Sequence, residues 1–158
     1  MSPAPPPLPL VLDTNVVLDM LVFDDPLVRP LAQALAAGEL SAWADGDTLR
    51  ELELVLAYPT FQLDEAARRA AYERYRSLVH LAPAETSTPP PPLPRCRDRD
   101  DQKFLVLTAR AGAIWLVSKD KRLLSLADRS GLPFVILSVK QAVQRLAGQS
   151  PSTTGAAR

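Results

Sequence analysis

The hydrophobic positions of this chain fall into two alternating patterns. Short, mostly apolar runs, of the length expected for buried strands, cover residues 10–12, 40–44, 79–82, 114–117 and 134–137. Between these runs, apolar residues recur every three or four positions, as they do along one face of an amphipathic helix. Strands that alternate with helices predict an α/β domain, with a mostly parallel sheet and helices on both of its faces.

Helix starts are marked by residues that favour the first turn. Asp45 or Asp47 can cap the helix after the second strand, and Asp64 can cap one that continues to about Leu78. Pro26 can occupy the first turn of an earlier helix, because proline needs no hydrogen-bond partner there. The apolar face of this earlier helix would consist of Leu27, Leu31 and Leu35.

Prolines set the expected domain boundaries. The chain has 158 residues, enough for one core and too few for two. Many of its 16 prolines lie in residues 1–7 and 83–94, and proline disfavours both helix and central strand. We therefore expect a Pro-rich disordered N-terminus at 1–7 and a single domain at 8–147 that contains a Pro-rich loop at 83–94. The remaining segment, 148–158, is expected to be a disordered tail.

The cellular location is indicated by the absence of three features, namely an internal disulfide, a membrane span and a signal peptide. Cys96 is the only cysteine, so the chain forms no internal disulfide, which is typical of a reducing compartment. No apolar run reaches the roughly 18 residues of a membrane span. The first 28 residues contain no Lys or Arg, although a signal peptide begins with positive charge. We expect a cytoplasmic protein that makes no contact with membranes.

Two aspartates lie where predicted strands end. Asp13 comes after the run at 10–12, and Asp120 comes shortly after the run at 114–117. The carboxyl ends of parallel strands meet at one edge of a sheet, where open α/β sheets bind their ligands. Helix capping accounts poorly for Asp13, because this residue follows a buried strand without a break. Both carboxylates are therefore candidates for one functional site.

Other acids lie where the sequence leaves their roles open. Asp98, Asp100 and Asp101 stand at a predicted helix start, where one or two of them can simply cap free N–H groups. Glu51 and Glu53 lie beside the apolar stripe of another helix, and their spacing does not choose between them. One member of each group would complete a cluster of carboxylates.

Few other reactive side chains are present. His80 is the only histidine, which excludes catalysis by paired histidines and His-rich zinc sites. The sequence has no Gly-rich phosphate loop and no G-x-S-x-G motif. Carboxylates with so few reactive neighbours indicate a hard cation such as Mg²⁺ or Mn²⁺.

The order of these motifs is similar to that of the PIN-domain family. The resemblance spans roughly residues 8–140 and is carried by LVLDTNVVLDML, LRELELVLAYPTF and CRDRDDQKFLVLTARAGAIWLVSKDKRLLSL. The branch that it most resembles comprises toxins of bacterial toxin–antitoxin systems, the VapC-type ribonucleases. This resemblance implies a Rossmann-like three-layer α/β/α sandwich that cleaves single-stranded RNA with Mg²⁺ or Mn²⁺. It also implies an antitoxin partner and a homodimer.

The resemblance also assigns roles to residues. Lys119 departs from the family, since many relatives have Gly before the last acid; it could contact an RNA phosphate or pair with Asp120. The implied catalytic and metal-binding acids are Asp13, Glu51, Asp101 and Asp120, with Asp98 as a further metal ligand and Asn15 and Ser118 as supporting polar residues. Our candidates for contact with the RNA backbone are Arg97, Arg99, Lys119 and Lys121.

Hydrolysis by a metal-activated water is the mechanism that the resemblance implies. The RNA 2′-OH would then take no part in the chemistry, and preference for RNA would come from contacts and shape. One alternative is a catalytically silent PIN-fold module that binds through a partner protein. Another is a Mg²⁺-dependent phosphatase or phosphoacceptor with Asp13 as its nucleophile. That chemistry usually needs a second acid where Leu12 or Asn15 stands here.

Overall fold

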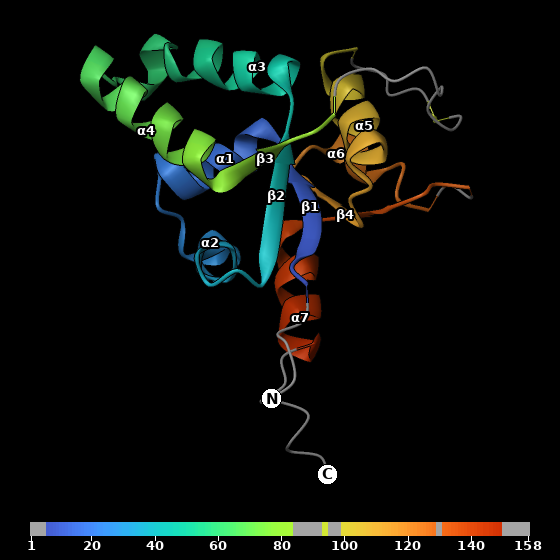
Figure 1. The fold of residues 1–158 in the computed structure, drawn as a ribbon. Helices are drawn as coiled ribbons and strands as arrows, with labels where there is room; N and C mark the ends of the chain where they lie inside the picture. Colours follow the sequence, from blue (N-terminus) through green and yellow to red (C-terminus); the bar gives the residue numbers. More distant parts are fainter. Residues whose placement is uncertain (1–5, 84–92, 95–98, 129–130, 150–158) are drawn as a thin grey trace.

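The computed structural model describes residues 6–83, 93–94, 99–128 and 131–149 (Figure 1). Within these ranges, five strands form one sheet in the order β3-β2-β1-β4-β5, and every neighbouring pair is parallel. The expected parallel sheet is confirmed. Its strands are β1 (Leu8–Leu12), β2 (Leu40–Ala44), β3 (Val79–Leu81), β4 (Trp115–Val117) and β5 (Val135–Leu137).

Helices cover both faces of the sheet, which confirms the three-layer α/β/α sandwich. Leu10 and Leu12 of β1 join the core formed with α1 to α4 and α7, whereas Val11 joins the core formed with α5 and α6. In Figure 1, α1 to α4 lie to the left of β1 and β2, and α5 and α6 lie to the right. The helices are α1 (Thr14–Leu21), α2 (Arg29–Ala36), α3 (Gly46–Leu56), α4 (Glu65–Leu78), α5 (Arg99–Ala111), α6 (Lys121–Leu124) and α7 (Val139–Gln149), with short 3-10 turns η1 (Pro26–Val28) and η2 (Pro59–Phe61).

Aspartate caps start two of the helices that place the site. Asp45, rather than Asp47, begins α3: its carboxylate accepts a hydrogen bond from the Thr48 N–H at 2.9 Å. The Thr48 hydroxyl in turn accepts from the Asp45 N–H at 3.1 Å, which completes a capping box. Asp64 begins α4 as expected, with a 2.7 Å hydrogen bond from the Ala67 N–H.

The helix expected to begin at Pro26 starts later. Residues 26–28 form the 3-10 turn η1, and the α-helix α2 begins only after it. Pro30 explains the break, because in a longer helix its missing N–H would interrupt the interior, whereas in α2 it lies in the first turn. Leu27 was expected on the apolar face and is 52% exposed, while Leu31 and Leu35 are buried.

Four other elements are shorter than expected: β3 lacks residue 82, β5 lacks residue 134, and β4 and α6 are also shortened. The predicted strand at 114–117 begins at Trp115, and Ile114 is 47% exposed. Helix α6 ends at Leu124, although the apolar pattern predicts a helix to about Ala127. At its end the Ser125 hydroxyl donates to a backbone carbonyl, a local hydrogen bond that competes with continued helix.

The ends of the expected domain are only partly described. Residues 1–5, 84–92 and 150–158, which include most of the segments expected to be disordered or loop, lie outside the described residues. Helix α7 continues to Gln149, two residues beyond its expected end at Ala147. None of the helices described here is long and apolar enough to cross a membrane.

Candidate active site

Four of the predicted acids line one cavity at the carboxyl edge of the sheet. Figure 1 shows α3 and α5 on either side of this edge, above β1 and β2. The cavity has a volume of about 180 Å³. We call it the acid cavity; its lining residues are Asp13, Thr14, Asn15, Glu51, Val55, Tyr58, Phe61, Asp101, Phe104 and Asp120. Four elements far apart in sequence therefore bring their carboxylates together.

The structure shows which of Glu51 and Glu53 lies at the site, a choice that the sequence pattern alone left open. Glu51 lines the acid cavity. Glu53 lines a larger hollow of about 580 Å³ between α3 and α4, which contains none of the four acids. The difference follows from helix geometry, since residues two positions apart point to different sides of α3.

Asp13 is a buried carboxylate with three hydrogen bonds. Its side chain is at the start of α1, where Oδ1 accepts from the Val16 N–H at 3.0 Å. Oδ2 accepts from the Ser118 hydroxyl and from the Lys119 N–H, the latter at 3.2 Å. The expectation that capping explains Asp13 poorly was therefore wrong, because one oxygen caps α1 while the other faces the turn after β4.

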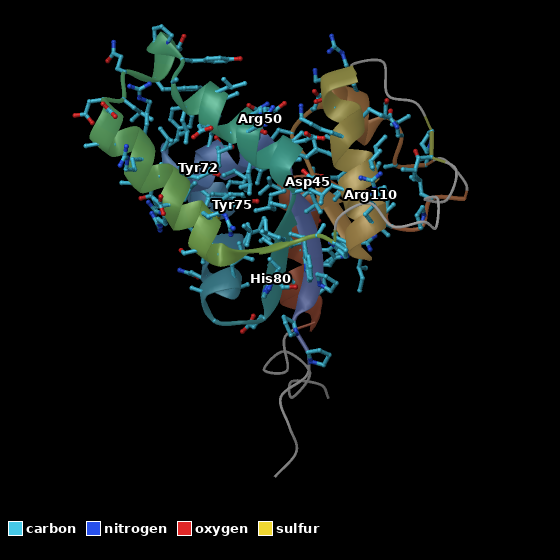
Figure 2. The ribbon with its side chains drawn as sticks, turned by 45° about the horizontal axis from the view of Figure 1, so that its top comes forward. Asp45, Arg50, Tyr72, Tyr75, His80 and Arg110 are labelled. Atoms are coloured by element: carbon cyan, nitrogen blue, oxygen red, sulfur yellow. The ribbon has the colours of Figure 1, made fainter. Side chains whose placement is uncertain are left out.

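Burial governs the charge of Asp13. The residue is only 4% exposed, and this burial raises the pKa of its carboxyl above the ordinary value of 3.8. The three hydrogen bonds act in the opposite direction without offsetting burial, and the charge of Asp120 raises the pKa further. Burial also raises the pKa of Tyr75, on α4 in Figure 2, and the charge of Asp13 adds to this rise. A negative charge at Asp13 is thus poorly compensated by the protein.

Ser118 connects the two turns that carry aspartates. Its hydroxyl donates to Asp13 and accepts from the Asp120 N–H at 2.9 Å, and the residue is fully buried. The Asp120 carboxylate caps α6 by accepting from the Arg122 N–H at 2.7 Å. Asn15 is exposed on the cavity wall. Both residues assigned as polar supports therefore lie at the site: Ser118 is buried between the two turns, and Asn15 is exposed on the cavity wall.

Glu51 is held by two residues that the sequence analysis did not assign to the site. The Thr14 hydroxyl donates to its Oε2, and the Lys103 ammonium lies 2.5 Å from its Oε1. Each side chain of this ion pair is 22% exposed. Lys103 follows Asp101 by two positions, but only the packing of α5 near α3 brings it to Glu51. No local pattern could have indicated this contact.

The family model of the PIN domain matches residues 9–122, which is well over half of the chain. This chain belongs to the PIN-domain family. PIN domains are typically metal-dependent nucleases. The search of curated proteins found no match.

A solved structure agrees with this PIN domain in fold. The crystal structure of PAE2754 from Pyrobaculum aerophilum superimposes with a TM-score of 0.55 and covers 90% of this chain and 91% of its own. The two sequences are 16% identical. At that identity, the likeness supports the α/β/α fold and carries no statement about activity.

The donor set of this PIN domain fits a hard divalent cation. Four carboxylates offer only oxygen atoms, the ligands that Mg²⁺ and Mn²⁺ prefer. In the part of the chain that the structure describes, no three acidic, histidine or cysteine side chains stand close enough to hold an ion together. Glu51 is instead engaged by Lys103 and Thr14. Binding of a cation would therefore require Glu51 to exchange one positive partner for another.

The predicted RNA-binding cations of this PIN domain have different surroundings. The Lys119 ammonium lies 2.7 Å from Oδ2 of Asp19, so it pairs with Asp19 rather than with Asp120. Lys121 is exposed at the start of α6. Arg97 and Asp98 lie outside the described residues, as does the side chain of Arg99. Their assigned roles stay predictions.

Replacing Lys103 by Met tests whether its ammonium occupies the place of a metal ion. In EDTA, Lys103→Met should lower the melting temperature, because Glu51 loses its counter-ion. The cost should lie between the ~1 kcal/mol of exposed pairs and the ~3 kcal/mol of buried ones. Millimolar Mn²⁺ should then raise the melting temperature more in the variant than in the parent, because no ammonium competes with the cation.

The matched control for this experiment is Arg69→Met. Arg69 pairs with Glu65 on α4 at 3.7 Å, and both side chains are more than 70% exposed. This variant should show the same Mn²⁺ effect as the parent. An equal Mn²⁺ effect in Lys103→Met and the parent would show that Lys103 does not compete with a cation.

Proposed function

We propose that this PIN domain is an endoribonuclease that hydrolyses single-stranded RNA with Mg²⁺ or Mn²⁺. The observation that carries the proposal is the acid cavity itself, which is lined by carboxylates from the ends of β1 and β4 and from α3 and α5. Family membership supports nuclease chemistry. The raised pKa of Asp13 adds to this, because a buried and poorly compensated carboxylate is stabilised by a nearby cation.

The residues of the site would have different roles in such an enzyme. Asp13, Glu51, Asp101 and Asp120 would hold the cation, with Asp98 as a further proposed ligand. A bound divalent ion lowers the pKa of its water ligand and neutralises charge on phosphoryl oxygens. Ser118 fixes Asp13 and ties its turn to that of Asp120. Asn15 offers an exposed amide that can donate to a phosphate oxygen.

Lys103 has a separate role in this proposal. It neutralises Glu51 while no cation is present, which limits repulsion among the four carboxylates. If a cation bound to Glu51 in place of Lys103, the ammonium of Lys103 would be released beside the cavity. There it can interact with the negative charge of a phosphate.

The proposal is tested by incubating the purified chain with a labelled single-stranded RNA. Mg²⁺ or Mn²⁺ should support cleavage and EDTA should abolish it. Because water is the attacking group, the products should carry no 2′,3′-cyclic phosphate, which mass spectrometry can measure. The Asp13→Asn variant, purified in parallel, controls for contaminating nucleases. Cleavage in excess EDTA, or cyclic phosphate ends, would contradict the mechanism.

A silent binding module is the second candidate function, and one observation favours it. Glu51 already has a cationic partner in Lys103, and no three acids in the described residues are gathered around a common point. In the same assay, such a module would leave the RNA intact at every metal concentration. The phosphoacceptor alternative gains no support, since Asp13 is 4% exposed and both its oxygens accept hydrogen bonds.

We further propose that the enzyme is the toxin of a toxin–antitoxin pair, inhibited by an antitoxin protein, and that it forms a homodimer. The support is the order of sequence motifs over residues 8–140, which resembles the toxin branch of the family. Light scattering by the purified chain measures the oligomeric state.

A further inference from the structure

Three aromatic side chains form a row at the wall of the acid cavity. Tyr58 and Phe61 line the cavity together with the acids. Their ring planes are nearly parallel, at 6°, with centroids 6.3 Å apart. Phe23 packs edge-on against Phe61, with centroids 5.6 Å apart. We call Phe23, Phe61 and Tyr58 the aromatic row.

The row leaves large aromatic surfaces in solvent. Phe23 and Tyr58 are each 53% exposed. Among the exposed large apolar side chains in the described ranges, they are the only aromatic ones; the others are Leu27, Leu54, Leu81 and Ile114. Phe61 is half-buried and packs against the main core, so it anchors the row. Core packing therefore accounts for Phe61 and leaves the two outer rings unexplained.

Two tight turns fix the position of the row. Phe23 is followed by Asp24 and Phe61 by Gln62, and both following residues have left-handed backbone, with φ of 46° and 54°. This conformation is uncommon for residues other than glycine. Asp24 is further held by an ion pair with Arg29 at 3.2 Å. The rings thus stand on constrained turns at the ends of α1 and η2.

We propose that the aromatic row stacks against an unpaired nucleobase of the strand that is cut in the acid cavity. This inference rests on the proposed function and adds how the substrate is held. A nucleotide has a flat base beside a negatively charged phosphate. Tyr58 and Phe61 of the row line the same cavity as the acids that would hold the cation, so this cavity offers surfaces complementary to both parts of the nucleotide. A protein partner bound to the row would account for the exposed rings but not for their position beside the carboxylates.

Stacking on this row has consequences for the choice of substrate. Every base has a π-face, so aromatic stacking tolerates any sequence. A base within a duplex is covered by its neighbours, whereas a base in a loop or single strand can be splayed onto a protein ring. The row therefore selects a single strand over a duplex without selecting a sequence.

The test measures binding of a short fluorescent oligouridine in excess EDTA, where cleavage is prevented, by fluorescence anisotropy. Tyr58→Ala should weaken binding about 5- to 100-fold, the effect of losing one stacked base. Tyr58→Trp should keep the parent affinity, and the strand should quench its added tryptophan fluorescence. The matched control is Leu54→Ala, since Leu54, on α3 four residues before Tyr58, is 62% exposed but lines the other hollow. It should bind like the parent.

Each contrary outcome has a separate meaning. Equal affinity of Tyr58→Ala and the parent, or no binding by the parent, would overturn the stacking proposal while cleavage with Mg²⁺ or Mn²⁺ still decides the proposed function. Weaker binding by Tyr58→Ala, in a chain that never cleaves, would overturn the nuclease function and retain the row as a base-binding surface. If light scattering shows a changed oligomeric state with unchanged strand binding, the row is a protein interface and the proposal is wrong.

Discussion

The Asp13→Asn variant is expected to cleave RNA at least about 100-fold more slowly than the parent, yet to melt at a higher temperature in EDTA. The loss of rate corresponds to losing several kcal/mol of charge stabilisation at the reacting phosphate. The gain in stability has a different source. Asn has nearly the volume of Asp and removes a buried charge that the protein compensates poorly.

The pH dependence of this gain follows from the raised pKa of Asp13. Between the unfolded pKa near 3.8 and the higher folded pKa, the folded state binds more protons than the unfolded chain. The stability that Asp13 contributes is therefore complete below pH 3.8 and is lost as the pH rises through the folded pKa. The melting temperatures of variant and parent should differ most above that pKa and converge toward pH 4.

The size of the gain is limited by hydrogen bonding. The amide of Asn can accept from the Val16 N–H through its oxygen, but its NH₂ group cannot accept from the Lys119 N–H. Each kcal/mol of stabilisation that remains after the loss of this hydrogen bond should raise the melting temperature by about 2–4 °C in a chain of this size. Millimolar Mn²⁺ should stabilise the parent and have little effect on the variant.

Asp64→Asn is the matched control for Asp13→Asn. Asp64 also caps a helix, α4, through one oxygen, but it is exposed and lies outside the acid cavity. This control should keep both the cleavage rate and the Mn²⁺ effect. A lower melting temperature for Asp13→Asn in EDTA at pH 8 would mean that the hydrogen bonds to Asp13 outweigh the cost of burying its charge.

The Asp101→Asn variant is expected to lose most of the activity, about 100-fold or more, while Asp100→Asn loses less than about threefold. Both acids lie in the first turn of α5, but it is Asp101 that lines the acid cavity. Adjacent helical residues point about 100° apart, which is the reason to expect different losses from the two variants. Initial cleavage rates at saturating Mn²⁺ compare the two variants directly. Equal losses would show that the helix start as a whole, rather than Asp101, serves the site.

The sequence predicted the fold and the general place of the acids for the same physical reason. Strands buried on both faces are continuous apolar runs, and the polar residue that ends such a run must lie at the edge of the sheet. This rule is sufficient to place Asp13 and Asp120 at the carboxyl edge. It also gave β2 with the bounds that the structure shows, Leu40–Ala44.

Contacts between distant elements could not be predicted in this way. The pairing of Lys103 with Glu51 depends on the packing of α5 near α3, and nothing within either helix indicates it. The aromatic row likewise joins Phe23 to Phe61 across 38 positions. The wrong expectation that Asp13 does not cap a helix has another origin. A carboxylate has two oxygens, so helix capping and ligand binding do not exclude one another.

The strand order also determines when during synthesis the site comes into existence. The strands made first, β1 to β3, form one side of the sheet, and β4 pairs with the free edge of β1 only after residue 117 has been made. A nascent chain that stops before α5 has Asp13 and Glu51 but neither Asp101 nor Asp120. Under the proposed nuclease function, an unfinished chain would therefore lack two of the four proposed metal-binding acids and would not cleave the messenger RNA that encodes it.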